Sequence, residues 1–155
     1  MKKIYVSKSL EETKSIAKTF VEKLLIMGGK SSGKAVVILL QGNLGSGKTT
    51  FVRAVGEVLR VQGNITSPTF VLEKVYKIKG NENFSQMVHI DAYRLSGEND
   101  MNALGWGEVV DNPKNIVFVE WPEVVSDVFP EDTPKIFLEF IDENTRTLTP
   151  DENWE

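Results

Sequence analysis

The chain has 155 residues, of which 41% are hydrophobic, and it contains no cysteine. This length is typical of one compact domain with a real core, so we expect a single domain over residues 1–155. The lack of cysteine excludes disulfides and thiolate metal sites, and leaves oxygen atoms as the expected ligands of any metal. The net charge of -4, with 18 basic and 22 acidic side chains, disfavours tight direct binding of nucleic acid.

Membrane and secretory signals are not apparent. No apolar run is long enough to cross a membrane, and the first residues lack the basic, apolar and small-residue order of a secretory leader. We therefore expect a cytoplasmic protein that has no membrane partner and is a monomer in isolation.

A short strand and a helix are predicted at the start of the chain. Residues 1–7 favour the strand, and Ser9 and Glu12 have the spacing of a capping box at the start of a helix. Apolar residues then recur at steps of three and four up to residues 27–29, which predicts one buried helix face. These residues are Ile16, Ala17, Phe20, Val21, Leu24 and Leu25.

The next segment predicts a strand, a glycine-rich loop and a second helix. Residues 35–41 form a continuous apolar run, typical of a strand that is covered on both faces. The loop GNLGSGKTT occupies residues 42–50, and apolar residues at 51, 52, 55, 58 and 59 give the following helix a buried face. This order is the context that a phosphate-binding loop requires.

The rest of the chain adds strands. Residues 71–79 and 84–91 predict an antiparallel pair, because a turn signal separates them at residues 80–83. A short helix and a loop are expected within residues 93–114, followed by strands at 115–121, 136–141 and 146–149. The expected fold is α/β: a three-layer domain like that of P-loop NTPases, with a mixed parallel and antiparallel central sheet flanked by helices.

The glycine-rich loop carries the most specific chemistry. Its glycines permit a tight turn in which backbone N–H groups converge on phosphate oxygens, next to the positive end of a helix dipole. Lys48 is expected on the β- and γ-phosphates, and the Thr49 hydroxyl on a Mg²⁺ ion that bridges them. The residues expected to bind the nucleotide here are Gly42, Asn43, Leu44, Gly45, Ser46, Gly47, Lys48, Thr49 and Thr50.

Two apolar strands end in an acid, Asp91 and Glu120. Both are candidates to face the loop, because ligands of open α/β sheets bind at the carboxyl edge. One acid would hold the metal and the other would orient water, and spacing does not decide between them. His89, the only histidine, is either a packing residue or a group that orients Asp91.

Three further positions are candidates for the site. In the segment TSPTF, Pro68 holds Ser67 extended, so that the hydroxyls of Ser67 and Thr69 either sense a γ-phosphate or belong to an ordinary turn. Trp121 is expected in the core or as a wall of the nucleotide site. Arg94 is expected to pair with phosphate or with surface carboxylates.

The motifs GNLGSGKTT, SPTF, HIDAYRL, LGWGE and VEW occur in this order, and through them the chain resembles the TsaE family, also called YjeE, from about Ser9 to Arg146. The resemblance implies a slow P-loop ATPase that works in forming threonylcarbamoyladenosine, the modified base next to the anticodon of certain tRNAs. It implies ATP and Mg²⁺ as cofactors, and TsaD and TsaB as partners. A TsaD–TsaB complex transfers the threonylcarbamoyl group to tRNA, hydrolysis resets that complex between turnovers, and tRNA is engaged only indirectly.

The resemblance also implies roles for individual residues. It makes Glu120 the metal-associated acid with Thr49, and Asp91 an acid needed for hydrolysis together with Lys48. It places Ser67 and Thr69 in a switch-like loop, Trp121 beside the nucleotide and Glu108 at the rim of the site. Ser46 stands where the family often has alanine.

Two other functions are weighed against this one. A small-molecule P-loop kinase is the alternative, but it needs a second substrate pocket and usually a lid rich in arginine. The chain has only Arg53, Arg60, Arg94 and Arg146. A GTPase is disfavoured because there is no Asn-Lys-x-Asp segment to bind guanine. The N-terminal helix and its capping region are our candidates for binding the base.

Overall fold

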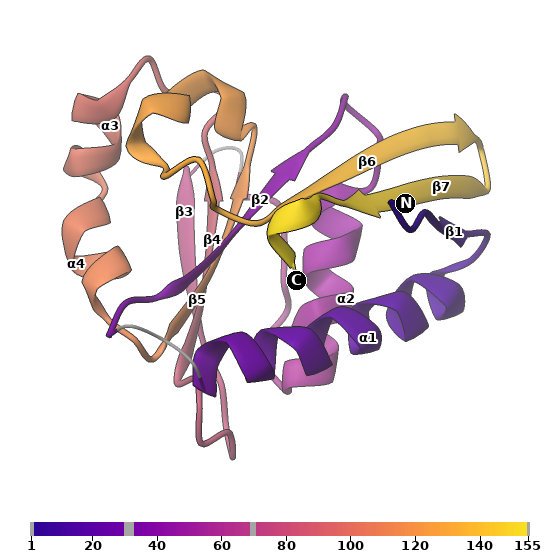
Figure 1. The fold of residues 1–155 in the computed structure, drawn as a ribbon, viewed down its shortest axis with the longest axis horizontal. Coiled ribbons are helices and arrows are strands. Elements are labelled where there is room, and N and C mark those ends of the chain that lie inside the picture. The colour runs from indigo at the N-terminus through magenta and orange to yellow at the C-terminus, as the bar shows by residue number, and fades with distance from the viewer. Residues whose placement is uncertain (1, 30–32, 69–70, 155) are drawn as a thin grey trace.

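A computed structural model describes residues 2–29, 33–68 and 71–154, and its seven strands form one mixed sheet (Figure 1). The strands are β1 (Tyr5–Ser7), β2 (Val36–Gln41), β3 (Glu73–Lys77), β4 (Gln86–Asp91), β5 (Asn115–Glu120), β6 (Lys135–Asp142) and β7 (Thr145–Pro150). Their order across the sheet is β1-β7-β6-β2-β5-β4-β3. The four central strands are parallel, whereas β7, β1 and β3 pair antiparallel at the two sides. The predicted mixed sheet is confirmed.

Helices cover both faces of this sheet (Figure 1). The helices α1 (Leu10–Gly29) and α2 (Lys48–Leu59) cover one face. The short helices α3 (Glu98–Ala103) and α4 (Trp106–Asp111) and the 3-10 segment η1 (Pro122–Val128) cover the other. A last 3-10 turn, η2 (Glu152–Trp154), packs its tryptophan with α1.

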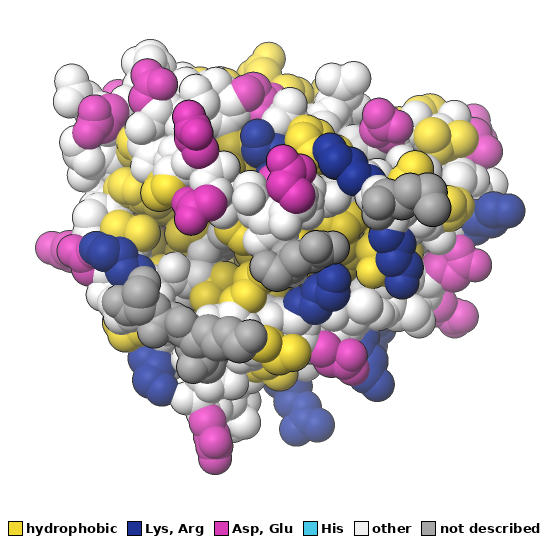
Figure 2. All heavy atoms as spheres, viewed as in Figure 1, with side chains coloured by type: hydrophobic (Ala, Val, Ile, Leu, Met, Phe, Trp, Pro, Cys, Tyr) yellow, Lys and Arg dark blue, Asp and Glu magenta, His cyan; other side chains and the backbone are white. Residues whose placement is uncertain are grey.

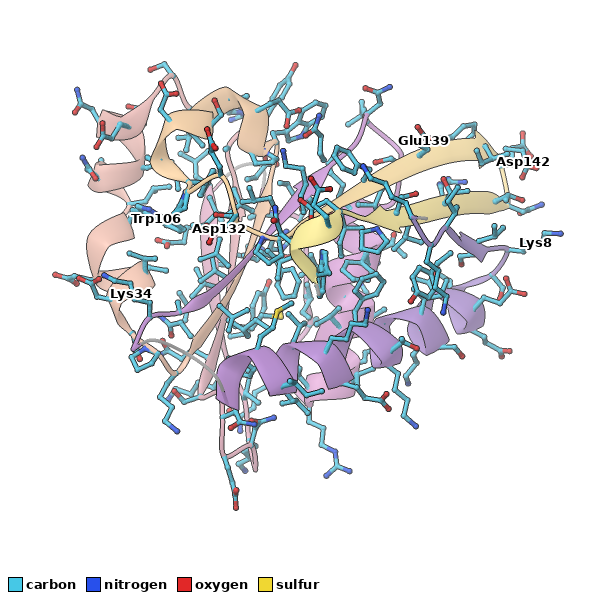
Figure 3. The ribbon with its side chains drawn as sticks, in the orientation of Figure 1. Lys8, Lys34, Trp106, Asp132, Glu139 and Asp142 are labelled. Carbon is cyan, nitrogen blue, oxygen red and sulfur yellow. The ribbon has the colours of Figure 1, made fainter. Side chains whose placement is uncertain are left out.

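Side chains along β5 point alternately to the two faces of the sheet, and each face has its own hydrophobic core. Ile116 and Phe118 pack in the cluster that α1 and α2 share, whereas Val117 and Val119 pack in the cluster below α3, α4 and η1. On the second face Trp106 from α4, labelled in Figure 3, meets Phe129 edge to face, with ring centroids 5.5 Å apart. Both faces of the central strands are therefore covered, which explains their continuous apolar runs.

The first two helices agree with the sequence prediction, but the capping box is only half formed. The Ser9 Oγ accepts a hydrogen bond from the Glu12 N–H at 3.1 Å, as expected. The Glu12 carboxylate, however, accepts from the Lys8 N–H at 2.6 Å instead of closing the box on Ser9. No helix in the described part of the chain is long and apolar enough to span a membrane.

Several element boundaries differ from the prediction. The pair β3 and β4 is antiparallel as predicted, but both strands are shorter than residues 71–79 and 84–91. One helix was predicted within residues 93–114, and the chain forms two, because Gly105 at φ 77 turns the backbone between α3 and α4. The strand β5 stops at Glu120, since Trp121 adopts φ 57 and leaves the sheet.

Candidate nucleotide-binding site

The glycine-rich loop and the two strand-end acids lie at one edge of the sheet. The loop follows Gln41 at the carboxyl end of β2, where Leu40 pairs in register with Glu120 at the end of β5. Glu120 in turn pairs in register with Asp91 at the end of β4. The parallel arrangement thus brings together three segments that are distant in sequence, at the position where α/β folds bind ligands.

Steric limits fix two of the loop glycines. A Cβ atom on Gly42 would lie 2.5 Å from the carbonyl oxygen of Leu138 and 2.5 Å from the Ser46 Oγ. Gly47 adopts φ 97, a left-handed conformation that other residues rarely take, immediately before α2. Gly42 is therefore required because neighbouring atoms leave no room for a side chain, and Gly47 is required because of its backbone conformation.

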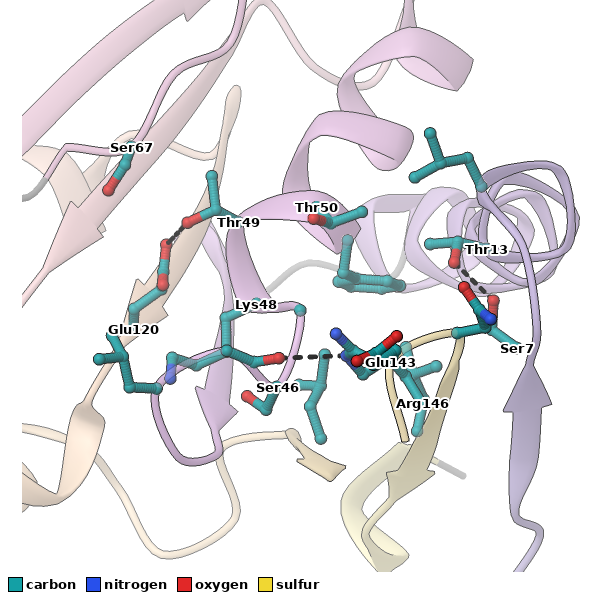
Figure 4. Close-up of a pocket in the computed structure, with 18 of the residues that line it drawn as sticks. Ser7, Thr13, Ser46, Lys48, Thr49, Thr50, Ser67, Glu120, Glu143 and Arg146 are labelled. Atoms are coloured by element: carbon teal, nitrogen blue, oxygen red, sulfur yellow. Dashed lines mark hydrogen bonds between the residues drawn. The ribbon is translucent and has the colours of Figure 1, made fainter. Parts of the chain in front are cut away.

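A cavity of about 540 Å³ opens beside the loop, a size suited to a bound small molecule (Figure 4). The loop residues from Leu44 to Thr50 line it, together with Ser67, Asp91, Glu120 and Trp121. Its far side is formed by the start of α1 and by the turn between β6 and β7. Lys8 and Asp142 lie at this same end of the molecule (Figure 3).

Lys48 is buried and folded over the loop. Its ammonium donates to the carbonyls of Gly42 and Asn43 and lies 4.1 Å from the ring centroid of Trp121. Burial lowers the pKa of the ammonium, against the opposing influence of Glu120, Glu123 and Asp91. The side chain thus lies at the loop that the sequence assigned to it, with loop carbonyls as its present partners.

Thr49 and Glu120 are joined directly. The Thr49 hydroxyl donates to Glu120 Oε2 at 3.0 Å, and the same oxygen lies 2.5 Å from His89 Nε2 (Figure 4 shows the threonine bond). One expectation is corrected here, because the histidine contacts Glu120 and not Asp91. His89 pairs in register with Phe118, and Glu120 lies two residues further along that strand on the same side, so its long side chain reaches the histidine ring diagonally across the two strands.

Asp91 also faces the cavity but has a different hydrogen-bond partner. Its carboxylate accepts from the Tyr93 N–H at 3.0 Å, and the residue is 4% exposed. The Tyr93 ring packs against Trp121, which lines the cavity, with ring centroids 5.1 Å apart. The two acids are therefore distinguished by geometry, since Glu120 contacts the predicted metal-binding hydroxyl and Asp91 is held by backbone.

Other predicted residues divide into those at the cavity and those away from it. Ser67 and Trp121 line the cavity, and Thr69 lies outside the described residues. Arg94 is not among the residues that line it. Glu108 is exposed in the first turn of α4, on the opposite face of the sheet from α2, and it is not among the described residues that line the cavity (Figure 1).

The cavity also contains residues that the motifs did not indicate. The helix cap was a candidate for binding the base, and Ser9 and Thr13 do line the cavity, with Thr13 Oγ1 2.6 Å from Ser7 Oγ. Arg146 from β7 donates through Nε to the Gly45 carbonyl at 3.1 Å. Only the return of the β6–β7 hairpin to the loop brings Arg146 here, so no local sequence signal could reveal it.

The residues present fit a magnesium ion shared with phosphates. Mg²⁺ is usually bound through one or two carboxylates, waters and substrate phosphates, and not in an all-protein cage. The hydroxyl of Thr49 and the carboxylate of Glu120 supply such a partial site. Among residues 2–29, 33–68 and 71–154, no group of three or more His, Cys, Asp or Glu side chains forms a cage.

The surface gives little support to nucleic-acid binding. On the face that Figure 2 shows, basic side chains are dispersed between acidic and apolar ones. This dispersion agrees with the scattered lysines of the sequence. It differs from the continuous basic stripe that phosphate-backbone binding favours.

Known proteins resemble the chain over most of its length. A family model described as "Threonylcarbamoyl adenosine biosynthesis protein TsaE" matches residues 7–148. The tRNA threonylcarbamoyladenosine biosynthesis protein TsaE of Treponema pallidum is 35% identical over 144 residues, covering 93% of this chain and 96% of that one. Its counterpart from Streptomyces coelicolor is 39% identical over 104 residues, covering 66% and 68%. A crystal structure of Bacillus subtilis YdiB matches with a TM-score of 0.65 and 27% identity, over 97% of this chain and 84% of that one.

Proposed function

This chain belongs to the TsaE family of threonylcarbamoyl adenosine biosynthesis proteins, and we propose that it is a Mg²⁺-dependent ATPase that assists this tRNA modification. In the proposed cycle it binds a TsaD–TsaB complex, which transfers the threonylcarbamoyl group to tRNA. Hydrolysis of ATP by the chain resets that complex between turnovers. The tRNA is engaged through the complex and not by the chain directly.

The observation that carries the proposal is the bond between Thr49 and Glu120 beside the glycine-rich loop. It joins the hydroxyl at the start of α2 to an acid at the end of β5, at 3.0 Å. The loop amides and the positive end of α2 are suited to bind the triphosphate, as the helix dipole and converging N–H groups favour anions. Together these features support binding of a nucleotide with its metal.

Each polar side chain of the site has a part in the proposed reaction. Lys48 leaves the loop carbonyls to bind the β- and γ-phosphates, and Thr49 and Glu120 hold Mg²⁺. A Mg²⁺ ion held by these two residues would supply positive charge to the transferring phosphoryl group. Asp91 orients the attacking water from the adjacent strand end. Trp121 covers the lysine and limits the access of solvent.

The nucleoside is proposed to lie between the start of α1 and the β6–β7 turn. The cavity extends from the loop to this region, where Ser9, Thr13 and Asn144 offer polar atoms. Competition between ATP and GTP for binding tests the choice of base. ATP is expected to bind more tightly, and equal affinities would remove the adenine part of the proposal.

Hydrolysis is favoured over phosphoryl transfer to a small molecule by the arginine content of the site. Among the residues that the structure describes, Arg146 is the only arginine that lines the cavity. It donates to a loop carbonyl and to carbonyls of its own turn. A kinase would need further cations to shield the phosphoryl group. Release of ADP and phosphate in equal amounts, without a phosphorylated acceptor, is the expected result.

Reconstitution of the modification tests the proposal. Threonylcarbamoyladenosine formation is measured over many turnovers of TsaD–TsaB, without the chain, with the wild type and with the Lys48→Ala variant. The wild type is expected to sustain turnover, whereas the variant, checked for folding by circular dichroism, is expected to allow little beyond the first round. Full modification with Lys48→Ala would contradict the proposal.

A further inference from the structure

We propose that His89 is a positioning residue that fixes Glu120 against Thr49 and thereby shapes the Mg²⁺ site. The inference rests on the proposed function, and it assigns a role to the one buried histidine. His89 is 0% exposed and sits in the middle of the central sheet, in register with Phe118 of β5. A polar ring in such a place requires a reason beyond filling space.

The geometry supplies that reason. His89 Nε2 lies 2.5 Å from Glu120 Oε2, and the Thr49 hydroxyl donates to the same oxygen at 3.0 Å. Glu120 Oε2 therefore accepts two hydrogen bonds, one from His89 on β4 and one from Thr49 at the start of α2. The other oxygen, Oε1, accepts from none of the described groups and is left for the metal or for its water. The side chain of Glu120 is thus held from two directions.

The second ring nitrogen identifies the tautomer. His89 Nδ1 is buried and has no hydrogen-bond partner among the described residues. A buried N–H group without an acceptor is costly and rare. A buried ring nitrogen that carries no hydrogen costs less, because it lacks only a donor to its lone pair. The neutral ring with its proton on Nε2 satisfies both sides, because Nε2 then donates to Glu120 and Nδ1 carries no hydrogen.

This arrangement is compatible with metal binding at Thr49. A hydroxyl can ligate Mg²⁺ through an oxygen lone pair while its hydrogen still points to a carboxylate. Glu120 must then stay in place for the threonine to keep the right orientation. Without the His89 donor, Glu120 is free to turn within the cavity, and the hydroxyl loses its fixed acceptor. Groups that orient metal ligands in this way typically change metal affinity about 10- to 100-fold when removed.

Two variants of His89 separate the hydrogen bond from the packing. His89→Gln keeps an N–H donor at the distance of Nε2, whereas His89→Met has a similar length but no donor. Thermal unfolding establishes that each variant is folded. Both are then compared with the wild type by calorimetric titration with ADP, first with a chelator present and then over a range of Mg²⁺ concentrations.

The variants are expected to change the affinity for Mg²⁺ and to leave the affinity of the phosphate loop for ADP unchanged. Without Mg²⁺, all three proteins are expected to bind ADP equally, because the loop amides are unchanged. The Mg²⁺ concentration that half-saturates the tight complex is expected to rise about 10- to 100-fold in His89→Met and to return towards the wild-type value in His89→Gln. A His89→Met protein with the Mg²⁺ dependence of the wild type would overturn the role of His89. A wild type that binds no nucleotide would instead overturn the proposed function.

A spectroscopic test works without nucleotide or activity. His89 is the only histidine in the chain, so ¹⁵N-histidine labelling gives one imidazole spin system. Long-range proton–nitrogen spectra of the wild type are expected to show the neutral Nε2–H tautomer. Glu120→Gln is expected to shift the Nε2 signal, and Asp91→Asn, as the control, is expected to shift it much less. A Nδ1–H tautomer, or equal shifts in the two variants, would contradict the inference and would do so even if His89→Met failed to fold.

Discussion

Replacing Gly42 with alanine should damage the phosphate loop through two contacts at once. The new methyl would lie 2.5 Å from the Leu138 carbonyl and 2.5 Å from the Ser46 Oγ. The carbonyl belongs to β6 and cannot rotate away, whereas the hydroxyl belongs to a short side chain. Overpacking of this kind costs about 1–3 kcal/mol, so the free energy of unfolding should fall by that amount and nucleotide affinity should fall with it.

Ser46→Ala separates the two contacts. Within the part of the chain that the structure describes, the buried Ser46 Oγ has no hydrogen-bond partner, so its removal alone should raise the free energy of unfolding by up to about 1 kcal/mol. In the double variant the clash of Gly42→Ala with Leu138 persists. Ser46→Ala should therefore recover only part of the loss, and a double-mutant cycle should give a positive but incomplete coupling.

Urea denaturation measures all three variants, with Gly97→Ala as the matched control. Gly97 has an extended backbone, and no atom lies within 4 Å of a Cβ built there. Gly97 is the N-cap of α3, where alanine is less favourable than glycine by roughly 0.5 kcal/mol, so the control should lose less stability than Gly42→Ala. A steric cause would be contradicted if Gly42→Ala were as stable as Gly97→Ala, or if Ser46→Ala restored all of the lost stability.

Three further changes test other contacts of the site and fold. Trp121→Phe should abolish most of the change in tryptophan fluorescence that nucleotide binding causes. The reason is that the Lys48 ammonium lies 4.1 Å from the indole centroid and must move to reach phosphate. An unchanged fluorescence signal would show that another tryptophan reports binding. Arg146→Ala should weaken nucleotide binding by about 1 kcal/mol in calorimetry, since it removes the 3.1 Å hydrogen bond to the Gly45 carbonyl. Undiminished affinity would show that this hydrogen bond does not hold the loop in its binding conformation. Burial raises the pKa of Glu73, so the folded state binds its proton more tightly and stability is lost as pH rises through the carboxyl range. Glu73→Gln should therefore stabilise the protein at neutral pH but not at pH values below the ordinary carboxyl range, and a pH-independent difference in urea denaturation would contradict this cause.

The local parts of the site could be predicted from the sequence. A buried strand, glycines at fixed spacing and an amphipathic helix specify the loop within residues 35–59, because each signal acts over a few neighbouring positions. The two acids could also be found, since Asp91 and Glu120 each follow an apolar strand. Parallel pairing then placed them side by side at the carboxyl edge, as the sheet topology requires.

Contacts that depend on distant segments could not be predicted. The partner of His89 is set by the register between β4 and β5, which no local pattern fixes, and Arg146 reaches the loop only because the β6–β7 hairpin folds back over it. Glu123 is close enough to Lys48 to oppose the lowering of its pKa by burial, yet it belongs to the 3-10 segment that follows the left-handed residue Trp121. Trp121 carries no local signal for its left-handed conformation, whereas a glycine, Gly105, marks the break between α3 and α4.

ATP hydrolysis that becomes faster when the chain binds TsaD–TsaB is the central feature of the proposed function. The direct measurement is phosphate release from ATP in Mg²⁺, by the chain alone and with TsaD–TsaB, for the wild type and the Lys48→Ala variant. We expect slow release by the wild type alone, faster release with TsaD–TsaB, and only background release by the variant in both conditions. The central claim would be contradicted by a wild-type rate that TsaD–TsaB leaves unchanged, or by hydrolysis that survives the loss of Lys48.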